Sequence, residues 1–172
     1  MTQNYFDFFG LAVNFDISIS ALETNYRKIQ TEVHPDKFVT ASSSEKMQSM
    51  QTATLANDAY QTLKQPALRA AYLLSLQGIT AISETNTAMP TDFLMQQMEW
   101  REQLEEAKQA NNVHAIETLA RELKAQANHL QTEFKTQFDE KNDFKSATDI
   151  ARKLIFIDKV SADTQHALAL LD

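Results

Sequence analysis

Glycine and proline are almost absent from this 172-residue chain, and they are the residues that most often make sharp turns. Glycine occurs only at positions 10 and 78, and proline only at 35, 66 and 90. Neither residue occurs between Thr91 and Asp172. Few sharp turns are therefore available, and we expect an all-α protein of long helices with short connections.

The N-terminal half predicts a helical hairpin. Ser20-Ala21-Leu22-Glu23 has the form of a capping box, and Leu22, Tyr26, Ile29 and Val33 follow at helical spacing. Pro35 cannot continue a helix and pushes His34 out of the helical region, so this helix should end near His34. Ser42-Ser43-Ser44 offers N-caps for a second helix. Its expected buried stripe is Met47, Met50, Ala53, Ala56 or Asn57, Tyr60 and Leu63.

A third helix should begin at Pro66 and end with Gly78 in the C-terminal cap position. Residues 79–90 lack a clear period and form the expected linker. We therefore predict an N-terminal domain at 1–78 and a C-terminal domain at 91–172.

The C-terminal domain predicts an antiparallel three-helix bundle, because Asn111-Asn112 and Asn142 interrupt its helical pattern. The expected core residues of the first helix are Phe93, Trp100, Leu104 and Ala107. Those of the second are Ile116, Leu119, Leu123, Leu130, Phe134 and Phe138. Those of the third are Phe144, Ala147, Ile150, Ala151, Leu154 and Ile157.

Composition excludes several classes of function. With 23 acidic and 16 basic side chains the net charge is −7, which argues against broad binding to nucleic acid or anionic membranes. The chain has no cysteine, so it can form neither disulfides nor a thiolate-ligated cluster. No apolar run reaches the length of a membrane span, and the N-terminus does not resemble a signal or transit peptide. We expect a soluble protein of a reducing cytoplasm.

His34 and Asp36 are the candidate polar pair of the N-terminal half. Histidine titrates near neutral pH, so an acid–base enzyme is one interpretation. No glycine-rich phosphate loop or nucleophile motif accompanies the pair, however. His114, His129 and His166 lack the spacing of zinc ligands. A protein-docking corner is the other interpretation.

The C-terminal domain carries apolar residues that its core does not need. Leu94, Met95 and Met98 project away from the core stripe of their helix, with Glu99, Glu102, Glu105 and Glu106 nearby. Phe156 projects away from the apolar face of its own helix, with Lys145, Asp149, Arg152 and Lys153 as expected neighbours. These residues either pack on the other domain or form a partner surface, for which methionine is well suited.

His34-Pro35-Asp36 between a capped helix and a longer one resembles the J-domain of co-chaperones that stimulate DnaK-type ATPases. A longer pattern resembles the HscB family, the J-type co-chaperones of iron–sulfur cluster biogenesis. It comprises Tyr5-Phe6, Phe9-Gly10-Leu11, His34-Pro35-Asp36-Lys37-Phe38, Arg69-Ala70-Ala71-Tyr72-Leu73-Leu74, Phe93-Leu94-Met95 and Arg152-Lys153-Leu154-Ile155-Phe156-Ile157-Asp158-Lys159.

The resemblance implies an L-shaped, monomeric protein of the bacterial cytoplasm that regulates a partner ATPase and has no catalytic residue, metal or cofactor of its own. Its contacts with the specialised ATPase HscA would be His34, Pro35, Asp36 and Lys37, with Arg27 and Lys28. Its contacts with the iron–sulfur scaffold IscU would be Leu94, Met95, Met98, Glu99, Arg101, Glu102, Glu106 and Phe156. The alternatives are a J-domain protein with another client, a helical interaction scaffold, and an acid–base enzyme that uses His34.

Overall fold

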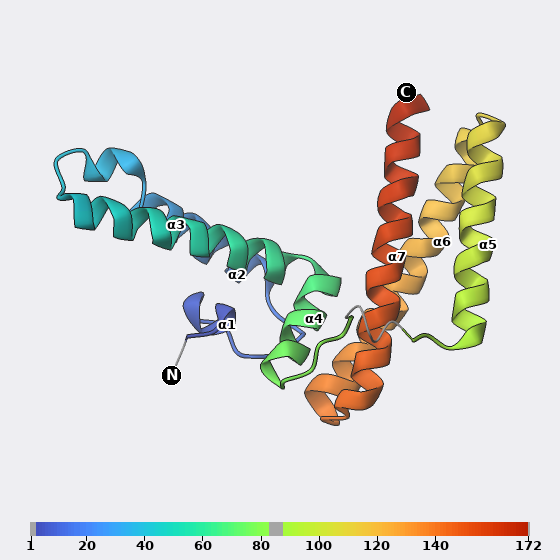
Figure 1. Ribbon diagram of the computed structural model, residues 1–172, viewed down its shortest axis with the longest axis horizontal. Coiled ribbons are helices and arrows are strands. Elements are labelled where there is room, and N and C mark those ends of the chain that lie inside the picture. The colour runs from blue at the N-terminus through green and yellow to red at the C-terminus, as the bar shows by residue number, and fades with distance from the viewer. Residues whose placement is uncertain (1–2, 83–87, 172) are drawn as a thin grey trace. The chain divides into compact units, whose positions relative to one another are not determined.

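The computed structural model describes residues 3–82 and 88–171, and within these ranges the chain is helical and has no strand (Figure 1). The all-α prediction is confirmed. The α-helices are α1 (Tyr5–Phe8), α2 (Ile19–Glu32), α3 (Ser43–Lys64), α4 (Pro66–Leu76), α5 (Thr91–Gln109), α6 (Val113–Lys135) and α7 (Phe144–Leu171). A 3₁₀-helix, η1 (Pro35–Phe38), follows α2, and a π-helix, η2 (Thr136–Glu140), follows α6.

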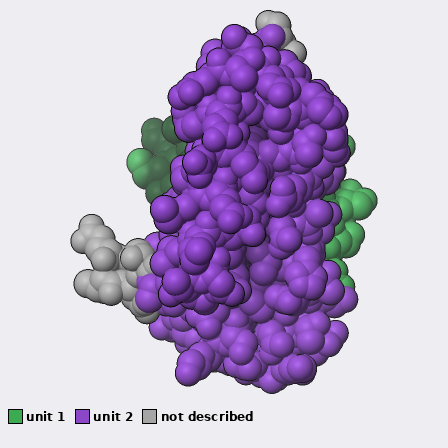
Figure 2. Space-filling model, turned by 90° about the vertical axis from the view of Figure 1, so that its right-hand side faces the viewer, with its two compact units in different colours: residues 1–72 green, residues 73–172 purple. Residues whose placement is uncertain are grey.

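The chain forms two compact units, residues 1–72 and 73–172, which Figure 2 colours separately. The boundary between the units falls within α4. The domain limits that the sequence suggests, 1–78, 79–90 and 91–172, stay a prediction. Residues 83–87 of the predicted linker lie outside the described residues.

In unit 1, α3 packs against α2, α1 and η1 around a core that contains Phe6, Phe9, Leu22, Ala56 and Leu63. Two of the N-terminal aromatic residues, Phe6 and Phe9, are buried in this core.

The start of α2 differs from the prediction. Its N-cap is Ser18, whose Oγ accepts a hydrogen bond from the backbone N–H of Ala21 at 3.1 Å. Ser20 already lies inside the helix, so the capping box at Ser20 was wrong by two residues. The serine cap of α3 is confirmed, because Ser42 Oγ accepts from Glu45 N at 3.2 Å.

The predicted buried stripe of α3 is also wrong in its first half. Met47 and Met50 are 63% and 69% exposed, whereas Ser49, Ala56, Ala59 and Leu63 are buried. Helices approach most closely where their side chains are small, and α3 meets its neighbours through serine and alanine. The longer methionines are left on the solvent face.

Four helical segments are followed by a residue of positive φ just beyond the last turn: Gly10 (φ +67°), Gly78 (φ +77°), Asn111 (φ +50°) and, after η2, Asn142 (φ +52°). After α4, Gly78 N–H bonds to Ser75 O and Ile79 N–H bonds to Leu74 O, which is the Schellman pattern. The predicted C-terminal cap at Gly78 and the interruption at Asn111 are confirmed.

In unit 2, α5, α6 and α7 pack against one another as a three-helix bundle (Figure 1). The predicted core is confirmed except at Phe93 and Phe144, which are half-buried. All six predicted residues of α6 and η2 are buried, and so are Trp100, Leu104 and Leu154. The π-helix at the end of α6 was not expected. It places Phe138 between two aromatic partners, with ring centroids 5.4 Å from Phe134 and 5.2 Å from Phe144.

Arg152 is buried in unit 2, whereas the sequence suggested a solvent-side neighbour of Phe156. Its Nε donates a hydrogen bond to the backbone carbonyl of Ala81 at 2.6 Å, and its Nη1 lies 3.6 Å from Asp149 Oδ1. Ala81 is itself buried. Arg152 therefore fixes the segment before residue 83 to the surface of α7.

Candidate interaction surfaces

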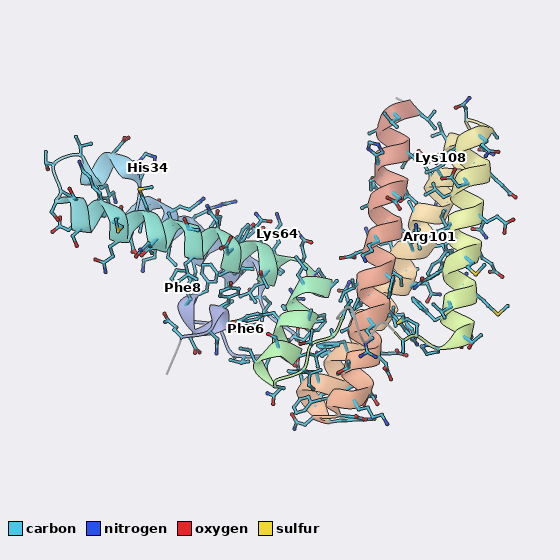
Figure 3. The ribbon with its side chains drawn as sticks, viewed as in Figure 1. Phe6, Phe8, His34, Lys64, Arg101 and Lys108 are labelled. Carbon is cyan, nitrogen blue, oxygen red and sulfur yellow. The ribbon has the colours of Figure 1, made fainter. Side chains whose placement is uncertain are left out.

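The His-Pro-Asp loop joins α2 to η1 at one end of the α2–α3 pair (Figure 3). The helix ends at Glu32, and His34 adopts extended backbone (φ −60°, ψ 134°), as the residue before a proline should. Pro35 then opens η1, and Lys37 N–H donates to His34 O at 3.0 Å. Proline thus ends one helix and begins the next turn.

The two polar side chains of this loop face solvent. His34 Nδ1 accepts a hydrogen bond from the backbone N–H of Asp36 at 3.3 Å and lies 3.6 Å from Asp36 Oδ2. A nitrogen that accepts this bond carries no hydrogen, so the imidazole orders the turn and does not donate to the carboxylate in this state. The Asp36 side chain is 89% exposed. Its oxygens are free to accept hydrogen bonds from a partner.

This geometry suits docking better than acid–base catalysis. A catalytic pair needs a pocket that holds substrate against it, and the His34 side chain is 58% exposed. In the described part of the chain, no group of three or more metal-ligating side chains is placed to hold an ion.

The basic residues assigned to the same contact are exposed on unit 1. Arg27 and Lys28 lie on α2, about two turns before the loop, and Lys37 lies in η1. Lys28 also borders a hollow of about 270 Å³ beside Phe8 and Ile29.

Two stacked tyrosines fasten α2 to α3. The rings of Tyr26 and Tyr60 lie 4.0 Å apart and are parallel to within 2°. Tyr26 OH donates to Asn57 Oδ1 and accepts from Gln30 Nε2 at 2.9 Å. Because the loop joins these two helices, the stack stabilises the frame from which the loop projects.

The second surface lies on α5 in unit 2. Leu94, Met95 and Met98 are 42%, 60% and 71% exposed, while Trp100 and Leu104 are buried beneath them. The sequence had placed these three apolar residues outside the bundle core, and the structure confirms that.

Two contacts between α5 and α7 show which side of α5 faces α7. Lys153 Nζ lies 5.7 Å from the Phe93 ring, and Arg101 Nη1 lies 3.6 Å from Asp163 Oδ2. Helical spacing places Leu94 and Met98 on the α7 side of α5 and Phe156 on the α5 side of α7, between those two contacts. The structure therefore brings Leu94, Met98, Arg101 and Phe156 to one seam of the bundle.

Phe156 is partly exposed, and Lys159 Nζ lies 5.2 Å from the centre of its ring. Partial desolvation raises the pKa of the neighbouring Asp158 carboxyl above its usual range. The ring is accessible to a partner and has a cation beside it.

The acidic residues assigned to the scaffold contact spread away from this seam. By helical spacing Glu102 lies on the outer crest of α5 with Met95, whereas Glu99 and Glu106 turn toward α6. Glu106 lines a hollow of about 570 Å³ between α5 and α6. The exposed face of α5 is thus apolar on the side toward α7 and acidic on the side toward α6.

Sequence reasoning missed two polar residues that shape this region. Gln97 is buried on α5, and Asp163 is the partner of Arg101. Gln97 interrupts an apolar stripe, and nothing in the sequence pattern indicates that its side chain is buried. Asp163 could have been found only from the relative register of α5 and α7.

No helix within residues 3–82 and 88–171 has the length and apolar character needed to cross a membrane.

Comparison with known proteins finds relatives that are similar to this chain over its whole length. Residues 89–165 match the family model described as the HSCB C-terminal oligomerisation domain. The co-chaperone protein HscB homologue of Burkholderia multivorans is 43% identical over 172 residues, covering 100% of this chain and 98% of the relative. The homologue of Aromatoleum aromaticum is 41% identical, covering 100% and 97%.

Solved structures of HscB proteins have the same fold as this chain. HscB from Vibrio cholerae is 37% identical, with a TM-score of 0.85 over 99% of this chain and 100% of its own. Human HscB is 32% identical, with a TM-score of 0.88 over 96% of this chain and 82% of its own. Full-length similarity at these identities, together with the shared helical fold, shows that the chain belongs to the HscB co-chaperone family.

Proposed function

We propose that this chain binds an IscU-type iron–sulfur scaffold through unit 2 and an HscA-type ATPase through unit 1, and that it stimulates ATP hydrolysis by the ATPase. The observation that carries the proposal is the presence of two exposed surfaces of different chemistry on two compact units. One is a polar corner with a fully accessible carboxylate, and the other is an apolar seam with an acidic border.

The proposed mechanism is coupling by proximity. When one chain holds both partners, the encounter between scaffold and ATPase becomes effectively intramolecular, which raises their local concentration. The His34-Pro35-Asp36 corner then favours the hydrolysing state of the ATPase, because it binds that state more tightly than the other. Asp36 is placed to pair with an arginine of the ATPase through charge-assisted hydrogen bonds. The chain itself breaks no covalent bond.

The ATPase contact is tested by single-turnover ATP hydrolysis by HscA, with and without this protein and IscU. His34→Gln should lower the stimulation at least about tenfold, because it removes the imidazole that orders the Asp36 turn. The matched control is His129→Gln, an exposed histidine on α6 that should stimulate as the wild type does. Full stimulation by His34→Gln would refute the docking role of this loop.

The scaffold contact is tested by calorimetry of IscU against the triple variant Leu94→Ala, Met98→Ala, Phe156→Ala. Loss of a central apolar cluster should weaken binding about 100-fold or more, since a few such side chains dominate most interfaces. The control is the double variant Met47→Ala, Met50→Ala, which removes equally exposed apolar side chains from unit 1. Unchanged affinity in a triple variant with a native circular dichroism spectrum would place the scaffold elsewhere.

A further inference from the structure

A groove between the C-terminal halves of α5 and α7 adjoins the proposed scaffold contact and shares one residue, Arg101, with it. It encloses about 460 Å³ in unit 2. Leu104 and Ala167, both buried, line its floor, and Leu170 borders it near the end of α7. Arg101 and Lys108, which follow one another along α5 in Figure 3, stand on one wall, and Asp163 and His166 stand on the other.

The groove continues the seam formed by Leu94, Met98 and Phe156. Arg101 belongs to both, because it is an assigned scaffold contact and also lines the groove. From there the groove follows α5 to Lys108 and α7 to Leu170, on the side of α5 that faces α7.

The charges along the groove differ from those on the rest of the scaffold surface. Arg101 pairs with Asp163 at 3.6 Å, and Lys108 Nζ lies 3.0 Å from Glu105 Oε1. Each cation thus has a carboxylate of its own, whereas Glu99 and Glu106 make the α6 side of α5 acidic. A near-neutral groove with an apolar floor suits an uncharged, apolar side chain.

Leu170 has no structural reason to be apolar. It is 71% exposed in the last turn of α7 and contributes little to the bundle core. An apolar side chain at the rim of a groove gains free energy when a partner covers it.

The assigned scaffold contacts cover only part of the area of a standard protein interface. They comprise eight residues, whereas a standard protein interface uses roughly 20–30 residues on each side. An interface of standard size would extend onto neighbouring surface, and the groove adjoins the assigned contacts and has an apolar floor.

We propose that the α5–α7 groove is the second half of the scaffold contact and takes an apolar side chain of the same IscU-type partner beside Leu170. This inference depends on the proposed function, and it extends the scaffold surface from Phe156 to the end of α7.

The test measures IscU affinity by calorimetry for Leu170→Ala and Leu170→Glu. We expect Leu170→Ala to weaken binding several-fold and Leu170→Glu about tenfold or more, because a charge would be placed in an apolar contact. The control is Met47→Glu, at a position of similar exposure on unit 1, which should bind as the wild type does.

The outcomes separate this inference from the function on which it depends. If the Leu94, Met98 and Phe156 triple variant loses binding and both Leu170 variants keep it, the groove inference is wrong and the proposed function stands. If the triple variant also binds normally, both are wrong.

A second measurement detects contact between IscU and the groove directly. In the wild-type protein with ¹³C-labelled methyl groups, addition of IscU should shift the signals of Leu170 and Ala167. Unshifted signals at saturation would overturn the inference. Shifts that instead follow the concentration of this chain alone would assign the groove to a second copy of the chain.

Discussion

Asp143 shows how one exposed side chain starts a long helix. Its carboxylate accepts hydrogen bonds from the backbone N–H of Ser146 at 3.1 Å and from Ser146 Oγ at 2.7 Å. Both bonds favour the ionised form, so they lower the pKa of the Asp143 carboxyl, with the Ser146 hydroxyl making the larger contribution. The backbone carbonyl of Asp143 accepts the bond from Ala147 N, which makes Asp143 the N-cap of α7.

The lowered pKa predicts a pH-dependent stability. A carboxyl whose pKa is lower in the folded state stabilises the fold above its unfolded pKa of about 3.9, and this contribution disappears as pH falls through the folded pKa. Asp143→Ala should therefore lower the melting temperature near neutral pH, and the difference from wild type should shrink at acid pH. Thermal unfolding followed by circular dichroism measures this effect.

The control for this prediction is Glu117→Ala, on the exposed face of α6, which removes a carboxyl without removing a helix cap. A difference between Asp143→Ala and wild type that stays constant down to acid pH would contradict the assignment of the stabilising bonds to the carboxylate.

Single residues also mark the limit of what could be predicted from the sequence. Arg152 fits the polar side of α7, and nothing in the local pattern indicates a partner 71 positions away in the chain. Its acceptor is a backbone carbonyl, which carries no signature in the sequence. The exposed His-Pro-Asp corner was predictable, because proline acts locally on its neighbours.

Among the helices, α6 and α7 were the most predictable. Most of their buried apolar residues are large, recur at three- and four-residue steps, and face one continuous core. On α3 the same rule failed in the first half of the helix, where Ser49 is buried and Met47 and Met50 are exposed, although Ala56 and Leu63 are buried as predicted. Small residues are needed on the side of α3 that lies close to its neighbouring helices, and hydrophobic patterning does not reveal the distance between helices.

Helix ends offer a test at the scale of one element. The residue Gly78 has φ +77°, and a Cβ built there meets no atom within 4 Å. Gly78→Ala should therefore cost only the backbone strain of a left-handed conformation, about 1 kcal/mol of the free energy of unfolding. Urea denaturation measures the change.

Gln77→Ala is the matched control, because it changes the preceding position, which has no positive φ. A loss of several kcal/mol for Gly78→Ala would mean that a methyl group at this position meets an obstacle, contrary to the open space around Gly78.

At the scale of the whole molecule, the fixed position of Ala81 on α7 predicts where unit 2 can be cut. A fragment of residues 73–172 keeps the carbonyl to which Arg152 donates, whereas a fragment of residues 91–172 loses it. A hydrogen bond made by a charged group contributes about 1.5–3 kcal/mol to stability. The longer fragment should be more stable by at least that amount in denaturant titrations.

Arg152→Met separates this hydrogen bond from other contacts of residues 73–90. It should destabilise the 73–172 fragment, which has the acceptor, and change the 91–172 fragment much less, because that fragment has already lost the hydrogen bond to Ala81. The same effect of Arg152→Met in both fragments would contradict this role for the Ala81 carbonyl.

The aromatic residues give the chain a separate optical reporter for each unit. All four tyrosines, including the stacked pair Tyr26 and Tyr60, lie in unit 1, and the single tryptophan, Trp100, is buried in unit 2. Tryptophan fluorescence therefore follows the bundle alone, and the near-ultraviolet tyrosine signal follows the unit that carries the His-Pro-Asp corner. Because coincident transitions are the test of all-or-none unfolding, the unlabelled protein can itself report whether its two halves melt together or one at a time.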